Sequence, residues 1–401
     1  MANSLLTPTA ITREALDILH QRLNFVSTIT RDYDDSFARE GAKIGNTLRI
    51  RLPNEYEVGD GAVINAQDTR EQSVTLEVTS QKHVAMNFTS ADLTMSLDNF
   101  SERIIQPAMA RLASAIEADV LSNVYKDVFN QVNNQGAAAT FGKAMDARKM
   151  LVDNLAPEDD RYVCMNTQDN RDLVDGLKGQ FNQQSIIAKQ NREGYLGRTA
   201  GFDWMENTLL PSHTRGGANT SYTTDTRTSA LATDGTAYSQ ITVASGSGTI
   251  VKGDVFTIAN AFRVHPESKI STGVLQQFVC TEDYAGGGGT VKISPSIILG
   301  GANQTVAIPS TSATAGLTFA GTASTAHGIS LAYQKGAFAF ATADLVLPKG
   351  CDMAERRVYD GISLRLIRDY DPVNDKLVTR VDVLYGYKTL RPQLAARMAN
   401  N

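Results

Sequence analysis

The stretch GISLRLIRDYDPVNDKLVTRVDVLYGYKTLRP (Gly361–Pro392) carries the clearest structural signal in this chain of 401 residues. Apolar and β-branched residues recur through Ile362–Tyr370 and again through Lys376–Tyr385, a pattern that is typical of strands. The intervening DPVND contains the aspartate, proline and asparagine that favour tight turns. The sequence therefore predicts two long strands joined by a short turn.

Two more strands are expected near the N-terminus, over residues 47–52 and 74–78, where apolar and polar residues alternate. The segment between them, Pro53–Ser73, is acidic and has too few apolar residues to fold alone. We expect an acidic hairpin that projects from the body of the fold and is available for contact with another chain. The candidate contact residues are Arg49, Arg51, Glu55, Glu57 and Asp60.

Helical spacing of apolar residues appears in three places. An N-terminal helix is expected from Thr7-Pro8, because proline fits the first helical position. A long helix is expected over Pro107–Phe129, a rod of roughly 30 Å at about 1.5 Å per residue. A third, Phe141–Leu155, precedes a short buried strand at Arg161–Asn166. Helices and strands together predict an α+β fold.

The composition changes between His213 and Gln334. Only about a tenth of these residues are charged, against 20% for the whole chain, and glycine, serine and threonine replace them. Short β-type runs such as QITVA, DVFTIA, LQQFVC and TVKIS are separated by glycine-rich turns. We expect an all-β domain of about 120 residues, inserted into a host domain whose strands resume after it.

The segment GYLGRTAGFDW (Gly194–Trp204) raises the possibility of a phosphate-binding loop. A P-loop requires a lysine and a hydroxyl residue after its last glycine, and the dinucleotide fingerprint requires the spacing G-x-G-x-x-G. The spacing of Gly194, Gly197 and Gly201 satisfies neither pattern. We therefore interpret these glycines as structural residues that allow positive φ in a loop before a strand.

Other functional classes are disfavoured. The formal net charge of −5 has the wrong sign for a protein that grips nucleic acid phosphates. The five histidines and three cysteines show no metal-ligand spacing, and the chain has no G-x-S-x-G nucleophile motif. No apolar run approaches the length of a membrane span, and the N-terminus lacks the pattern of a secretion signal. We expect no catalytic residue, no cofactor, no metal and no membrane association.

The order of these parts resembles the major capsid proteins of tailed double-stranded DNA bacteriophages, in particular the short-tailed-phage coat branch that carries an inserted β-domain. The resemblance implies the Hong Kong phage-type capsid fold. It assigns residues 1–37 to an N-terminal arm, 38–90 to the E-loop, 91–134 and 361–401 to the P-domain with its spine helix, 135–212 and 335–360 to the A-domain, and 213–334 to the inserted domain.

The resemblance implies a coat subunit that self-assembles into pentamers and hexamers of an icosahedral head. The implied partners are other copies of the chain, a scaffolding protein, a portal protein, and packaged double-stranded DNA that is enclosed without sequence-specific binding. The implied location is the virion, with assembly in the host cytoplasm. Three alternatives remain at this point: a shell that encloses enzyme cargo, a nucleotide-binding enzyme, and a carbohydrate-binding module in the inserted domain.

Overall fold

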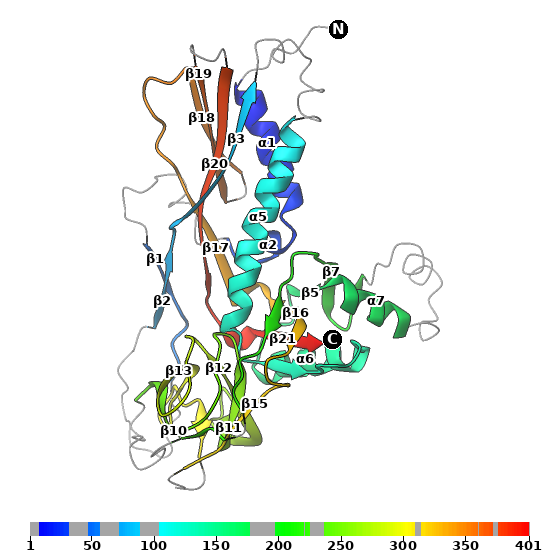
Figure 1. Cartoon of the computed structure of the whole chain (residues 1–401), viewed down its shortest axis with the longest axis vertical. Helices are drawn as coiled ribbons and strands as arrows, with labels where there is room; N and C mark the ends of the chain where they lie inside the picture. The colour runs from blue at the N-terminus through cyan, green and yellow to red at the C-terminus, as the bar shows by residue number, and fades with distance from the viewer. Residues whose placement is uncertain are drawn as a thin grey trace, which may run out of the picture. The chain divides into compact units, whose positions relative to one another are not determined.

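The computed structural model describes residues 8–31, 47–56, 72–88, 104–176, 197–219, 221–224, 236–308, 314–359, 361–371 and 376–400. The chain divides into two compact units (Figure 1). Unit 1 comprises Met1–Arg51, Ser73–Val120 and Phe338–Leu390. Unit 2 comprises Leu52–Gln72, Leu121–Ala337 and Arg391–Asn401. Each unit is built from segments far apart in the sequence.

The core of unit 1 is an antiparallel sheet. Its strands, in spatial order, are β17 (Phe338–Ala343), β20 (Lys376–Thr389), β19 (Ile362–Asp371) and β18 (Met353–Tyr359), and β3 (Ser80–Phe88) also pairs with β20. The two long strands predicted from the sequence are confirmed as β19 and β20, whose register runs from Arg365 opposite Asp382 to Asp371 opposite Lys376. β20 continues four residues beyond the predicted end, to Thr389.

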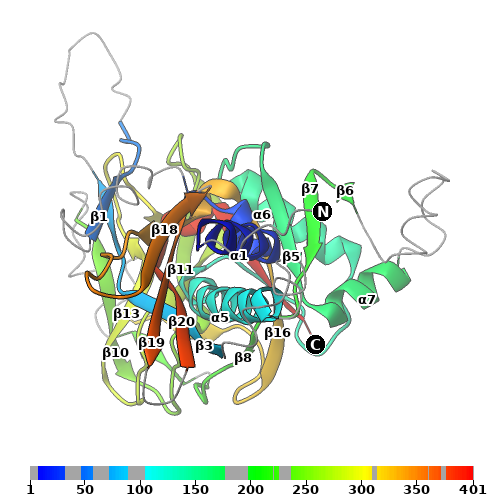
Figure 2. The same cartoon turned by 90° about the horizontal axis from the view of Figure 1, so that it is seen from above.

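Two helices cover one face of this sheet (Figure 2). They are α1 (Pro8–Arg22), which lies against β18 and β19, and α5 (Gln106–Val124). The short helix α2 (Asn24–Thr28) follows α1, and the amide of Phe25 donates a hydrogen bond to the buried Glu117 carboxylate on α5. Buried Leu16 and Leu19 show that α1 packs on its own subunit.

The predicted spine helix is α5, but it ends earlier than expected. A 3-10 turn (Tyr125–Asp127) follows Val124, and Val128 already has extended backbone angles. Val128 and Phe129 are apolar enough to continue the helical pattern, but they are buried in non-helical conformations. Tertiary packing therefore ends the helix where the sequence pattern does not.

The strands of the predicted projection are confirmed. β1 (Thr47–Arg51) and β2 (Ser73–Glu77) pair antiparallel, with Ile50 opposite Val74. Their inward residues Ile50 and Leu76 are buried with alanines of β17 in a separate cluster of unit 1. The base of the hairpin is thus anchored in the core, whereas the predicted tip, residues 57–71, lies outside the described residues.

Unit 2 contains a second, mixed sheet. Its strands are β4 (Gln131–Asn133), β21 (Ala395–Asn400), β16 (Ala326–Gln334), β5 (Arg161–Met165), β7 (Phe202–Glu206) and β6 (Arg198–Thr199), and β8 (Ser212–Thr214) pairs with β16. The helices α6 (Phe141–Asp153) and α7 (Thr167–Gly176) belong to the same unit. Thr140 caps α6, since its side chain accepts a hydrogen bond from the amide of Lys143. We call this sheet with its helices the host part of unit 2.

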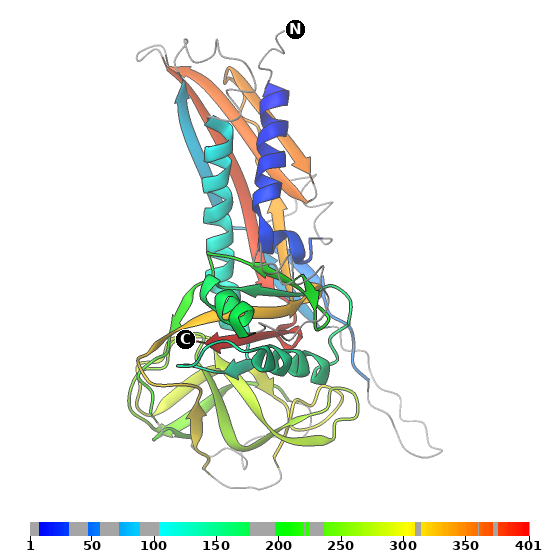
Figure 3. The same ribbon diagram turned by 90° about the vertical axis from the view of Figure 1, so that its right-hand side faces the viewer.

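The remainder of unit 2 is a β-barrel, drawn in yellow-green beside the host sheet in Figure 3. Its strands are β9 (Thr223–Thr224), β10 (Tyr238–Ser245), β11 (Val255–Val264), β12 (Ser271–Cys280), β13 (Gly289–Ile297), β14 (Val306–Ala307) and β15 (Leu317–Phe319). β15 pairs with β11, and a bridge from Gly316 to Thr223 joins it to the opposite end of the sheet. The sheet therefore closes on itself around an apolar core that includes Phe256, Phe278 and Val291.

Several predicted domain boundaries differ from the observed sheets. β16 was assigned to the inserted domain but is a central strand of the host sheet, and β21 was assigned to the P-domain but lies in unit 2. β17 and β18 were assigned to the A-domain, and β3 to the E-loop, but all three belong to the sheet of unit 1. β3 pairs with β20, β16 with β5 and β21 with β4, each across more than a hundred residues, and local sequence patterns contain no information about such pairings.

Candidate functional site

The predicted contact residues of the projection are only partly described. Arg49 and Arg51 are exposed on β1, and the Arg49 Nε donates to the Ser73 hydroxyl at 2.7 Å. Glu55 forms an ion pair with Lys269 of the barrel, with the carboxylate and ammonium 2.8 Å apart. Glu57 and Asp60 lie outside the described residues. Glu55 is thus held by its own chain, a contact that the sequence did not predict.

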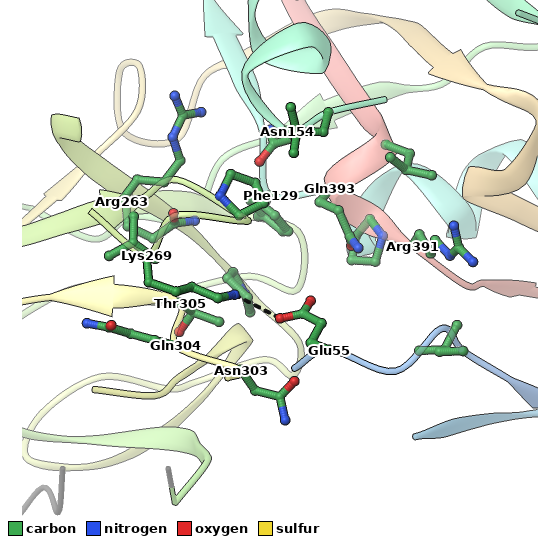
Figure 4. A pocket seen from close by; sticks show the side chains of 18 of the residues that line it. Glu55, Phe129, Asn154, Arg263, Lys269, Asn303, Gln304, Thr305, Arg391 and Gln393 are labelled. Carbon is green, nitrogen blue, oxygen red and sulfur yellow. Dashed lines mark hydrogen bonds and ion pairs between the residues drawn. The ribbon is translucent and has the colours of Figure 1, made fainter. Parts of the chain in front are cut away.

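This ion pair lies at a pocket within unit 2 (Figure 4). The cavity is about 380 Å³, and Arg263, Lys269 and Arg391 bring basic side chains to its wall. Arg263 is paired with Asp153 of α6 at 2.8 Å. The wall is otherwise formed by prolines, aliphatic side chains and neutral amides. The pocket therefore joins the base of the projection, the barrel and the host part.

The structure supports the interpretation of the predicted glycines as structural residues at two of three positions. Gly197 and Gly201 have φ angles of 64° and 78°, a region that residues with a Cβ rarely adopt. The Gly197 carbonyl accepts a hydrogen bond from the amide of Trp204 on β7. Gly194 lies outside the described residues. The loop turns the chain into β7.

A buried polar cluster connects the barrel to the host part, and we call it the domain junction. Three side chains form a hydrogen-bonded row. The Tyr125 hydroxyl lies 3.1 Å from His213 Nδ1, and His213 Nε2 lies 2.9 Å from Asp254 Oδ1. The other Asp254 oxygen accepts the amides of Gly216 and Val251 at 3.0 and 2.9 Å. Asp254, at the start of the barrel, is thereby fixed to the end of the spine helix and to β8.

Two more residues complete the junction from the host sheet. Arg397 of β21 is fully buried and donates to the carbonyl of Gly253, beside Asp254. Its burial lowers the pKa of the guanidinium to about 10. His327 of β16 packs edge-on against His213, with ring centroids 5.5 Å apart, and lies 3.2 Å from the Gln135 side-chain nitrogen. The amide side chain of Gln277 adds a strand-like contact, pairing with the main-chain nitrogen and oxygen of Gln131 at 2.8 and 2.9 Å.

The junction makes stability depend on pH. Burial, reinforced by the positive charge of Arg397 and by His213, lowers the pKa of His327 from 6.5 to about 4. A histidine with a lowered folded-state pKa stabilises the fold above its ordinary pKa, and this stability is lost as the pH falls from 6.5 towards 4. Over this pH range, the contribution of His327 to the free energy of unfolding falls by about 3 kcal/mol.

We therefore expect the unfolding free energy of the unassembled chain to fall between pH 7 and pH 4. In the His327→Gln variant this fall is expected to be about 3 kcal/mol smaller. Urea unfolding at both pH values measures this difference. The matched control is His265→Gln, since His265 lies in the turn between β11 and β12 and not at the junction. Equal acid sensitivity of all three proteins would show that His327 is not a source of it.

The sequence did not identify the junction. The histidines show no metal-ligand spacing in the sequence, and in the structure His213 and His327 are buried and hydrogen-bonded. Asp254 is one of few charged residues in its region. This could have indicated a buried polar site, because an isolated carboxylate must find hydrogen-bond partners when it is buried. The partners come from three other segments, so their identity required the structure.

Within the ranges that the structure describes, no three His, Cys, Asp or Glu side chains are grouped to hold a metal ion. No helix in the same ranges is long and apolar enough to cross a membrane.

A helix-covered antiparallel sheet with a long spine helix, a hairpin anchored at its base and a second unit that carries a β-barrel are features of the class of Hong Kong phage-type coat subunits. The family model described as "P22 coat protein - gene protein 5" matches residues 42–398. The chain belongs to this family of phage coat proteins and is a major capsid protein that forms an icosahedral shell.

Solved structures of low sequence identity are also similar. A chain from Mycobacterium phage Che8 is 12% identical, with 94% of this chain and 90% of that chain covered and a TM-score of 0.47. A chain from the mature capsid of bacteriophage PhiM1 is 10% identical, with 90% of this chain and 83% of that chain covered and a TM-score of 0.43. A chain from the capsid of Ralstonia phage GP4 is 7% identical, with 93% of this chain and 87% of that chain covered and a TM-score of 0.42. No curated protein sequence matched this chain.

Proposed function

We propose that the chain forms the pentamers and hexamers of a phage head that encloses packaged double-stranded DNA. The observation that carries this proposal is the match to the coat protein family over residues 42–398. A net charge of −5 is compatible with it, because a lining that bound phosphates tightly would resist the movement of DNA during packaging. The subunit acts structurally, without a catalytic step.

The proposed partners are other copies of this chain, a scaffolding protein during assembly and a portal protein at one vertex. Assembly takes place in the host cytoplasm, and the product is the virion. Closed shells require heterologous contacts, in which one patch of a subunit binds a different patch of its neighbour. The anchored strands β1 and β2 would give a contact made by the residues between them a fixed base.

We propose that the projection makes inter-subunit contacts through Arg49, Arg51, Glu55, Glu57 and Asp60. Exposed ion pairs contribute only about 0–1 kcal/mol each, but a shell repeats each contact at every equivalent position. The intrachain pair of Glu55 with Lys269 means that Glu55 contributes to holding the base of the projection as well as to its charge.

Charge reversal at Glu57 and Asp60 together is expected to lower the yield of assembled particles and to change its salt dependence. Particles and free subunits are separated by sedimentation over a range of salt concentrations. Glu55→Lys is tested separately, alone and with Lys269→Glu, because the second substitution restores the intrachain ion pair. If the yield and the salt dependence of the Glu57 and Asp60 variant are unchanged, the projection does not contribute to the contact between subunits.

A further inference from the structure

The projection leaves its paired strands through a short segment. The pairing of β1 with β2 ends at Arg51 opposite Ser73, and the amide of Leu52 then donates to the carbonyl of Gln72 at 2.8 Å. We call Leu52–Glu55 together with Gln72 the neck. The neck belongs to unit 2, and it forms part of the wall of the pocket that also contacts the barrel and the host part. Contacts within unit 2 therefore fix the point from which the chain continues into the tip.

One ion pair joins the neck to the barrel. The Glu55 carboxylate and the Lys269 ammonium lie 2.8 Å apart across the pocket (Figure 4). The side chain of Lys269 is 21% exposed and that of Glu55 is 52% exposed. Within the described part of the chain, neither side chain has another ionic partner. The pair is thus the charged contact through which the barrel acts on the neck.

Lys269 adopts a backbone conformation that is unfavourable for lysine. Its φ angle is 53°, in the left-handed region that glycine adopts without cost. Two main-chain hydrogen bonds close the turn around it, from Lys269 to the His265 carbonyl at 3.0 Å and from His265 to the Ile270 carbonyl at 2.9 Å. Strain of this kind is concentrated at functional positions. A lysine here can reach Glu55, which a glycine could not do.

The host part holds this turn in place. Arg263, near the end of β11, pairs with Asp153 at the end of α6, with the guanidinium and carboxylate 2.8 Å apart. The Arg263 side chain is only 14% exposed. The Arg263 carbonyl also accepts a hydrogen bond from the Thr272 hydroxyl at the start of β12. Both strands that flank the turn are therefore fixed, and Lys269 presents its ammonium from a rigid support.

We propose that Lys269 is a positioning residue for assembly: through it, the barrel holds the neck in one orientation before two subunits meet. The inference rests on the proposed contact of the projection with a neighbouring subunit and gives the barrel a role in that contact. A neck that is already held loses less conformational freedom when the contact forms, so assembly begins at a lower concentration. A partly exposed ion pair contributes little to global stability, so its effect is expected in the neck and in assembly.

Amide exchange tests whether Lys269 holds the neck. Lys269→Met retains the aliphatic part of the side chain and removes the charge. In the unassembled chain, exchange of the Leu52 amide is expected to become about fivefold faster, while the urea midpoint of unfolding stays unchanged. Lys269→Arg keeps a positive charge and is expected to keep the slow exchange. Unchanged exchange of Leu52 in Lys269→Met would overturn the proposal.

A double-mutant cycle tests whether Glu55 is the partner through which Lys269 acts. Glu55→Gln is expected to accelerate exchange of Leu52 as much as Lys269→Met, and the double variant is expected to be no faster than either single one. Additive effects would show that the two side chains act separately and would overturn the proposal. The matched control is Lys292→Met, since Lys292 pairs with Glu282 at 2.6 Å in the same barrel and lies outside the pocket. It is expected to leave exchange of Leu52 unchanged.

The same variants test the effect on assembly. Sedimentation gives the concentration at which half of the chain is in particles. This concentration is expected to rise about fivefold in Lys269→Met and in Glu55→Gln, and no further in the double variant. Lys269→Arg and Lys292→Met are expected to assemble like the unsubstituted chain. A purely structural role of Lys269 would instead lower the unfolding free energy, which is measured on the same samples.

The outcomes separate this inference from the proposed function. Failure of the unsubstituted chain to form particles would count against self-assembly, and exchange of Leu52 would still decide whether Lys269 holds the neck. If particles form, faster exchange together with a raised assembly concentration supports the positioning role. Faster exchange with an unchanged assembly concentration overturns it.

Discussion

Asp254→Ala is expected to lower the unfolding free energy of the chain by about 3 kcal/mol or more. The carboxylate is buried and accepts hydrogen bonds from His213 and from the amides of Gly216 and Val251. Alanine leaves all three donors unsatisfied in a buried site, and each unsatisfied group costs about 1–3 kcal/mol. Denaturant unfolding of the unassembled chain measures the loss.

The matched control for Asp254 is Asp283→Ala in the same barrel. Asp283 is exposed and accepts one amide hydrogen bond, from Lys252 at 2.7 Å. Its loss is expected to cost about 1 kcal/mol or less, because water replaces the bond at an exposed site. Amide exchange adds a local measurement: Asp254→Ala should lose protection first at the start of β11 and around His213. Equal unfolding midpoints for the two variants would contradict the role given to the junction.

Asp382→Ala is expected to destabilise unit 1 by about 3–5 kcal/mol. Asp382 on β20 is fully buried and pairs with Arg365 at 2.8 Å and Arg380 at 2.7 Å, and it accepts a hydrogen bond from Gln81 on β3. Burial alone would raise the pKa of Asp382, but the hydrogen bonds and charges of the two arginines outweigh it and hold the pKa below its ordinary value. Removing the carboxylate leaves the largely buried Arg365 uncompensated.

An ion pair whose carboxylate is half exposed, beside the same sheet, provides the control. Asp352 lies about half exposed and pairs with Arg368 at 2.9 Å. Asp352→Ala is expected to cost about 0–1 kcal/mol, as exposed pairs do. Thermal or denaturant unfolding of both variants is compared at pH 7. Asp382 is ionised at this pH, because the stabilisation that it provides is lost only as the pH falls below 3.8, the ordinary pKa of an aspartate. A smaller loss for Asp382→Ala than for Asp352→Ala would show that the buried pair does not stabilise the sheet.

The sequence predicted the elements whose signal is local. Alternation predicted β1 and β2, recurring apolar and β-branched residues predicted β19 and β20, proline at the first position predicted the start of α1, and the apolar stripe predicted α5. The change in composition after Pro211 predicted an inserted all-β domain. Low charge and frequent glycine turns can be read from one segment alone, without knowing which strands pair. The α+β class followed from these elements together.

What the sequence could not predict depends on contacts between distant segments. The place of β16 in the host sheet is decided by its pairing with β21 and β5, which lie far away in the chain on either side. The domain junction needs Tyr125, His213, Asp254 and Arg397 in one place, and no spacing rule connects them. The intrachain partner of Glu55 was missed for the same reason.

Electron microscopy of the expressed full-length chain tests the central claim most directly. We expect closed shells of uniform diameter, with capsomers of five and six copies and the β-barrel resolved as a separate feature of each subunit. A protein that remains a monodisperse monomer at every concentration, or that forms only unordered aggregates, would contradict the account of this chain as a self-assembling coat subunit.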